Sequence, residues 1–438
     1  MRFSSRFLAL ALLFCADTAL AQPATAPGVD VWSTLYPRPP QSTVTQPAAN
    51  PAQPTTGVPQ PPIGINTGSF IIYPMLTAAA YFDDNVFARN TNRLGDWAYV
   101  LRPEVALRSN NWANAQVAAN AFIEKRWYSK FTTEDQFNAA AAVGGTVQPD
   151  ADTQLVGKLV YIHAHEDRGT SESILTQFVR PLAYDQFEAA GAINKRFERV
   201  WASLGAAGVW VHYQDGVIGT TTISQAYRNG TIARVPARLG YVVAPLTSVF
   251  VEVSGHWRDF QVDTFDSSGY RVVGGLLFEP GPGARIKGEI FAGYMRQNYT
   301  GGFQTVSTWT YGSNLAFLVA PNITAVFEGC RDAKEASLSG GVVPGDGVSV
   351  IETLAALRAD VLVMPNVVIG AGASYLVDEY LLANRTDRSL SPLFSAKWFV
   401  NRYLTLGFDY RHVRFDSSGL GVLGYLRNVY LFSAHLKF

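Results

Sequence analysis

The sequence has no excess of charge of either sign. Its 35 Lys and Arg residues balance 35 Asp and Glu residues, and charged residues make up only 16% of 438 positions, whereas about 25% is usual. A balanced chain offers no broad basic surface, so we expect no nucleic-acid partner. Cysteine is also scarce, with only Cys15 and Cys330. Because Cys15 falls in a segment that we expect to be removed, the mature chain has no internal disulfide bond.

Long apolar runs are missing as well. No stretch of about 20 apolar residues follows the N-terminus, so the sequence predicts no membrane-spanning helix. The N-terminus has Arg2 and Arg6, then an apolar run over residues 7–14, then a small-residue triplet that ends at Ala21. This order is typical of a secretory signal peptide. We therefore predict a signal peptide over residues 1–21, which is cleaved after Ala21.

Proline is concentrated in one segment. Residues 22–62 hold 11 of the 23 prolines of the chain. A segment of this composition buries too little apolar surface to fold by itself. We predict a Pro-rich periplasmic linker over residues 22–65, followed by one folded domain over residues 66–438.

Apolar and polar residues alternate along most of the predicted domain, as they do in β-strands with two different faces. In residues 349–363, Ile351 and Leu357 lie on one face, and Glu352 and Arg358 lie on the other. A soluble secreted sandwich or propeller would show the same alternation. The connections between the strands separate these alternatives from a membrane barrel.

The connections alternate in length. Tight turns at Pro245, Pro321 and Pro365 are separated by longer polar segments such as residues 166–183. Short turns on one side and long loops on the other are typical of outer-membrane barrels. The sequence therefore predicts an all-β fold, a transmembrane antiparallel β-barrel of about 18 strands. An even number of strands places both chain ends on the periplasmic side.

The final strand ends on an aromatic residue. Tyr430, Phe432, Ala434, Leu436 and Phe438 occupy every second position. Such an ending is similar to the signal by which barrel-insertion machinery recognises outer-membrane proteins. We expect Phe438 to be a membrane-insertion signal, and we expect the lipid bilayer and the insertion machinery to be partners of the chain.

A resemblance to a known family begins near residue 60. Residues 69–77, followed by an aromatic-rich segment containing Asp83-Asp84-Asn85-Val86-Phe87, resemble the start of the Putative β-barrel porin 2 families of proteobacterial outer membranes. The resemblance continues to the C-terminus. It implies an outer-membrane barrel, and similar barrels are either called porins or linked to export of exopolysaccharide. No functional residues of the family carry over.

Charged residues on the polar strand faces predict a water-filled interior, because ionised groups near the middle of a bilayer cost several kcal/mol each. A barrel of about 18 strands is also too wide for side chains to fill. Two interpretations stay open: oppositely charged walls that select solutes, and internal salt bridges that only stabilise the wall. The candidate lumen-lining residues are five arginines assigned to three consecutive strands and five acids on three later strands, namely Arg228, Arg234, Arg238, Arg258, Arg271, Glu328, Asp332, Glu352, Asp360 and Asp378.

These observations predict a porin-like outer-membrane channel for polar solutes. One alternative is an exopolysaccharide export barrel that works with periplasmic export proteins, and another is a surface scaffold or adhesin that conducts nothing. No nucleophile motif or phosphate-binding glycine loop is present, and His163 and His165 have no third ligand nearby in the sequence. We therefore expect no enzymatic activity, no cofactor and no metal site.

Overall fold

The computed structural model describes residues 63–438, apart from residues 111, 171–177, 280–282, 302–303, 336–348, 382–384 and 419–423. The expected signal peptide and nearly all of the expected linker lie outside the described residues, so both stay predictions. In the part of the chain that is described, no helix is long and apolar enough to cross a membrane.

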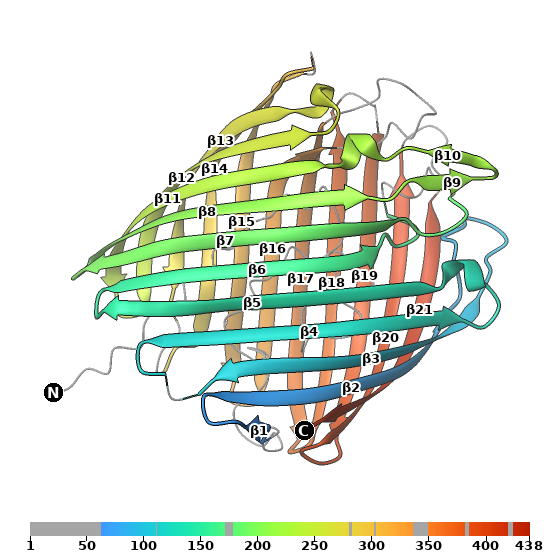
Figure 1. Ribbon diagram of the computed structural model, residues 1–438, viewed down its shortest axis with the longest axis horizontal. Helices are drawn as coiled ribbons and strands as arrows, with labels where there is room; N and C mark the ends of the chain where they lie inside the picture. The colour runs from blue at the N-terminus through green and yellow to red at the C-terminus, as the bar shows by residue number, and fades with distance from the viewer. Residues whose placement is uncertain are drawn as a thin grey trace.

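Eighteen antiparallel strands of 12 to 16 residues form one closed β-barrel (Figure 1). Strand β2 pairs with β3 on one side and with β21 on the other, which closes the barrel. The expected fold class and strand number are confirmed. The strands are β2 (Phe70–Asp83), β3 (Asp96–Ser109), β4 (Ala115–Tyr128), β5 (Gln136–Asp150), β6 (Thr153–His165), β7 (Ala183–Phe197), β8 (Val200–Tyr213), β11 (Gly230–Ala244), β12 (Thr247–Phe260), β13 (Ser267–Phe278), β14 (Ile286–Tyr299), β15 (Val306–Ala320), β16 (Ile323–Glu335), β17 (Ser349–Met364), β18 (Val367–Tyr380), β19 (Arg385–Phe399), β20 (Leu404–Ser417) and β21 (Tyr425–Lys437).

The two ends of the barrel differ in their connections. At one end, which we call the short-turn end, five of the eight connections are two residues long, and both ends of the described chain lie here. The other end, the long-loop end, carries connections such as residues 166–182 and 214–229. Short elements also occur outside the barrel wall: β1 (Ile65–Asn66), β9 (Gly216–Ile218), β10 (Thr221–Ile223) and the 3₁₀ turns η3 (Thr132–Glu134), η4 (Ala226–Arg228) and η5 (Asp263–Phe265).

The alternation in the sequence becomes an alternation between the outer and inner faces of the wall. On β3, Leu101 is 43% exposed on the outer face, whereas its neighbour Arg102 is 3% exposed on the inner face. On β17, Leu357 is 55% exposed and Asp360 is 5% exposed. Apolar side chains therefore point outward and charged ones inward, which is the arrangement expected for a barrel in lipid.

The interior also contains apolar clusters near each end. Trp201, Phe250 and Phe291 belong to a cluster toward the short-turn end. Tyr184 and Tyr213 belong to a larger cluster toward the long-loop end. The charged inner residues of β11 to β13 lie between these two clusters along the barrel axis, so apolar packing holds the charged layer in place from both sides.

Candidate functional site

Inward-facing charge is concentrated on β11 to β18. Nine of the ten candidate lumen-lining residues lie on these strands with their side chains on the inner face, and their role in guiding solutes stays a prediction. The nine are Arg234 and Arg238 on β11, Arg258 on β12, Arg271 on β13, Glu328 and Asp332 on β16, Glu352 and Asp360 on β17, and Asp378 on β18.

The tenth candidate, Arg228, was wrongly assigned to a strand. It lies on η4 in the long connection between β8 and β11, and it is 4% exposed. Its guanidinium donates to both carboxylate oxygens of Glu166, at 3.1 and 3.0 Å. Alternation assigns faces only within strands, so it could not place a residue in this connection.

Three of the arginines predicted to form a basic wall are paired with acids of the inner face. Arg238 binds both Glu252 and Glu289, with Glu289 at 2.8 Å. Arg234 and Arg271 bind Oε1 of Glu252 at 2.7 and 3.0 Å. The Nη1 atom of Arg271 also lies 3.5 Å from Asp332. We call this set the central cluster: Arg234, Arg238, Glu252, Arg271, Glu289 and Asp332.

Aromatic rings support the guanidinium groups of the central cluster. Arg238 lies over the Phe250 ring at 4.8 Å, and Arg271 lies over the Phe291 ring at 5.1 Å. A cation over an aromatic face is attracted by about 0.5–2 kcal/mol. Because these side chains are buried, each charge needs a partner, and loss of one partner from such a pair costs about 3–5 kcal/mol. The arginines of the central cluster thus make the contacts expected of internal ion pairs.

Candidate acids form a row across three strands. Asp332 is in register with Glu352, and Glu352 is in register with Asp378. The Nζ atom of Lys334 lies 2.5 Å from Glu352 and 3.3 Å from Asp378. The lysine thus offsets part of the mutual repulsion of the three carboxylates.

The other two candidate acids lie closer to the short-turn end of the same wall. Asp360 binds Arg358 at 3.0 Å, and Arg358 also donates to Ser395 at 3.0 Å. Glu328 faces inward in register with Asn314 and is partly exposed. The side chains of Glu352 and Arg358 are 13% and 20% exposed. Solvent therefore reaches this wall more readily than it reaches the arginines of the central cluster.

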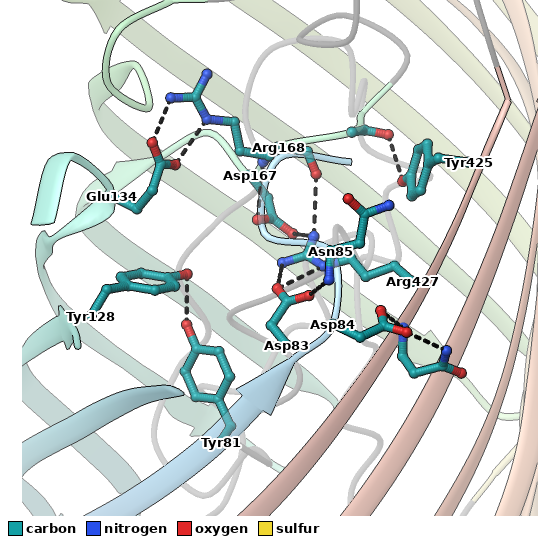
Figure 2. Close-up of polar contacts among 12 residues, drawn as sticks. Tyr81, Asp83, Asp84, Asn85, Tyr128, Glu134, Asp167, Arg168, Tyr425 and Arg427 are labelled. Atoms are coloured by element: carbon teal, nitrogen blue, oxygen red, sulfur yellow. Dashed lines mark hydrogen bonds and ion pairs between the residues drawn. The ribbon is translucent and has the colours of Figure 1, made fainter. Parts of the chain in front are cut away.

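A second group of buried charges lies at the long-loop end and holds the junction of β2 and β21 (Figure 2). On the inner side, Oδ2 of Asp83 accepts hydrogen bonds from Nε and Nη2 of Arg427 at 2.8 and 2.5 Å. Asp83 is completely buried and Arg427 is 3% exposed. This ion pair joins the first and the last strand of the barrel.

The next two residues of the motif reinforce the same junction. Asp84 accepts hydrogen bonds from the backbone N and from Nδ2 of Asn428, both at 2.6 Å. Asn85 donates from Nδ2 to the carbonyl oxygen of Leu426 at 2.9 Å. Three consecutive residues, beginning at the last residue of β2, thus bind three consecutive residues of β21. The motif that carries the family resemblance closes the barrel.

Residues 166–170, which we call the strap, extend from the end of β6 to β21. The strap is bound on several sides. Arg168 binds Glu134 of η3 at 2.8 and 2.7 Å. Asp167 lies 3.4 Å from Arg427, and Tyr425 donates to the carbonyl oxygen of Gly169 at 2.8 Å (Figure 2).

A glycine is required where the strap meets β21. Gly169 has a φ of +87°, and a Cβ atom there would lie 2.5 Å from the hydroxyl oxygen of Tyr425 and 2.7 Å from Cβ of Ala88. L-residues rarely adopt this backbone conformation. Sequence reasoning identified neither the strap nor its partners, because the partners of Asp167 and Gly169 lie more than 250 positions away. The only signal was the Asp83-Asp84-Asn85 motif, whose contacts could not be inferred.

The two neighbouring histidines of β6 contact different partners. His163 binds Asp185 at 2.9 Å, and His165 binds Asn138 at 3.0 Å. Among the described residues, no group of three or more His, Cys, Asp or Glu side chains is placed to hold a metal ion.

Phe438 lies at the short-turn end of the β2–β21 junction. Its backbone N donates to the carbonyl oxygen of Pro74 at 3.1 Å, and its ring lies 6.3 Å from that of Tyr403. Phe438 is 54% exposed. The aromatic end of the chain is thus accessible in the folded barrel, and its role as an insertion signal stays a prediction.

Two of three comparisons with known proteins found matches. Residues 58–438 match the family described as "Putative beta-barrel porin 2". Similar solved structures include OpdL from Pseudomonas aeruginosa, with 12% identity, coverage of 84% of this chain and 99% of that chain, and a TM-score of 0.43. A BenF-like porin from Pseudomonas fluorescens Pf-5 has 9% identity, coverage of 84% and 98%, and a TM-score of 0.43. The comparison with curated proteins gave no match.

The family match spans the whole barrel, including the motif that closes it and the strand that ends at Phe438. The chain therefore belongs to the Putative beta-barrel porin 2 family and is a porin-like channel of the outer membrane.

Proposed function

We propose that the protein is a passive, water-filled channel for small polar solutes. The observation that carries this proposal is a closed barrel of 18 strands whose inner face bears charged rows such as Asp332, Glu352 and Asp378. Barrels of 16 to 18 strands leave an aqueous channel. The partial exposure of Glu352 and Arg358 supports a route along the β16–β18 wall.

The strap sets the size limit of this route in our proposal. It lies at the long-loop end, between β6 and β21, and its ion pairs with Glu134, Arg228 and Arg427 hold it from several directions. We expect this segment to reduce the opening without blocking it. Solutes up to the size of a small sugar are expected to pass, and long polymers are not.

Liposome swelling tests the proposal. Vesicles that contain the purified protein are diluted into isotonic solutions of uncharged sugars of increasing size. The proposal predicts fast swelling with a pentose, slower swelling with a disaccharide and none with a dextran. An absence of swelling with every sugar, from a protein shown to be folded and inserted, would contradict it. An export barrel that opens only with periplasmic partners, or a closed scaffold, would give that second result.

Export and insertion belong to the same proposal. Residues 1–21 would direct secretion and be removed, and Phe438 would identify the barrel to the insertion machinery. N-terminal sequencing of the protein from the outer-membrane fraction is expected to begin at Gln22. A first residue at Met1 in the inserted protein would contradict this part of the proposal.

A further inference from the structure

The two ends of the barrel carry different charge on the inner face. Among the three residues of each described strand that lie nearest the short-turn end, five are inward-facing cations and none is an inward-facing carboxylate. Each of the five lies on the same face of its strand as buried inner residues, so it is assigned to the inner face. They are Arg108 on β3, Arg196 on β7, Lys287 on β14, Lys397 on β19 and Lys437 on β21. We call this set the basic rim.

The long-loop end shows no such surplus. Among the three strand residues nearest the long-loop end, five inward cations of the described strands lie together with four inward carboxylates. These cations are already engaged in short-range contacts. Arg427 binds Asp83, Arg385 binds Asp387, and Lys334 lies 3.3 Å from Asp378. Arg126 binds Glu124, and Arg258 donates to the carbonyl oxygen of Ala333.

Carboxylates near the basic rim offset only part of its charge. Glu279, one residue beyond β13, binds Arg196 at 2.9 Å. Glu104 shares a row with Lys437 through Met75, but Glu104 is bound by Arg102 at 3.3 Å.

Arg108 and Lys287 are the exposed members of the rim, so their charge is open to solvent, and Lys397 is partly exposed. They come from strands at separate positions around the barrel. The positive charge is therefore distributed around the opening.

We infer that the basic rim is an anion-collecting vestibule, so that the channel takes small anionic solutes in preference to cations. This inference rests on the proposed function as a passive channel. Lumen charge of one sign raises the local concentration of the opposite ion and repels ions of its own sign. In outer-membrane barrels the short turns face the periplasm, so the vestibule lies on that side.

Reversal potentials in planar bilayers test the inference. Under a KCl gradient, the wild-type channel is expected to prefer chloride. The triple variant Arg108→Gln, Lys287→Gln, Lys397→Gln removes three members of the basic rim and should shift the reversal potential toward that of a non-selective pore. Lys195→Gln is the matched control, since Lys195 lies near the same end in an outer-surface pair with Asp150. The control should keep the wild-type value.

A second measurement needs no variant. The screening length falls from about 30 Å at 0.01 M salt to about 3 Å at 1 M, so the chloride preference of the wild type should decline as salt rises. A conducting channel that prefers potassium, or a triple variant with an unchanged reversal potential, would overturn the inference and leave the channel itself intact. A folded, inserted protein that conducts nothing would instead overturn the proposed function, and the inference with it.

Discussion

Arg238 joins two carboxylates that are themselves almost fully buried. Glu252 and Glu289 are each 1% exposed, and Arg238 contacts both. Arg234 and Arg271 bind Glu252, and Glu289 accepts hydrogen bonds from both Nη atoms of Arg238, at 2.8 and 3.3 Å. A buried carboxylate without its cation is costly, because neither water nor another charge replaces the lost partner.

Arg238→Met should therefore destabilise the barrel by about 3–5 kcal/mol. Urea unfolding in lipid vesicles, followed by tryptophan fluorescence and by heat-modifiable migration in gels, measures the change. Arg414→Met is the control, because Arg414 and Asp416 form a pair whose side chains are 61% and 56% exposed. Exposed pairs contribute about 0–1 kcal/mol. Equal stabilities for the two variants would show that the central cluster does not support the fold.

At the scale of elements, the strap depends on contacts made by a few side chains. Arg168 holds it through two hydrogen bonds to Glu134 and one to the carbonyl oxygen of Phe178 at 2.7 Å. These contacts attach the strap to the β4–β5 connection and to its own loop. Without them, the contacts near β21 and the ion pair of Glu166 with Arg228 are left to keep the strap in place.

Arg168→Ala is expected to give a larger and noisier single-channel conductance, since a released strap leaves a wider opening that fluctuates. Single-channel recording in planar bilayers measures both properties. Arg89→Ala is the matched control, because Arg89 is exposed at the same end and its guanidinium lies over the Phe87 ring at 5.2 Å. Conductance in Arg168→Ala that matched the control would mean that the strap does not limit the opening.

The strands could be predicted from the sequence, and the strap could not. Alternation at residues such as Leu357 and Arg358 reflects the two environments of a barrel wall, which are repeated in every strand, so strand number and faces are readable. The connections follow no such repeat. Arg228 was misplaced for that reason, and the pairing of Arg427 with Asp83 joins residues 344 positions apart. The sequence also offered no way to decide which inner arginines are neutralised, because that depends on rotamers and cross-strand contacts.

At the scale of the whole molecule, the barrel reverses the polarity of a soluble protein. Its outer surface exposes Val251, Leu357 and Trp309 at 54%, 55% and 72%, whereas charged groups lie inside. This arrangement is stable only if lipid surrounds the outside and water enters the inside. A charge placed on the outer face near mid-strand should therefore cost far more than the same charge one residue away.

Leu357→Arg and Ala356→Arg test this reversal at adjacent positions of β17, one outward and one inward. The outward arginine should lower the unfolding free energy in lipid vesicles by about 2–4 kcal/mol. The inward arginine should change it much less, since its side chain reaches the aqueous interior. The opposite order would mean that the faces are assigned to the wrong environments.

The central claim is that a continuous aqueous route runs through the closed barrel. Single-channel recording of the purified mature protein in planar bilayers tests it most directly. The account predicts discrete conductance steps that are linear in voltage at low potentials and increase with salt concentration. Bilayers that stay electrically silent, although heat-modifiable folded protein is recovered from them, would contradict it.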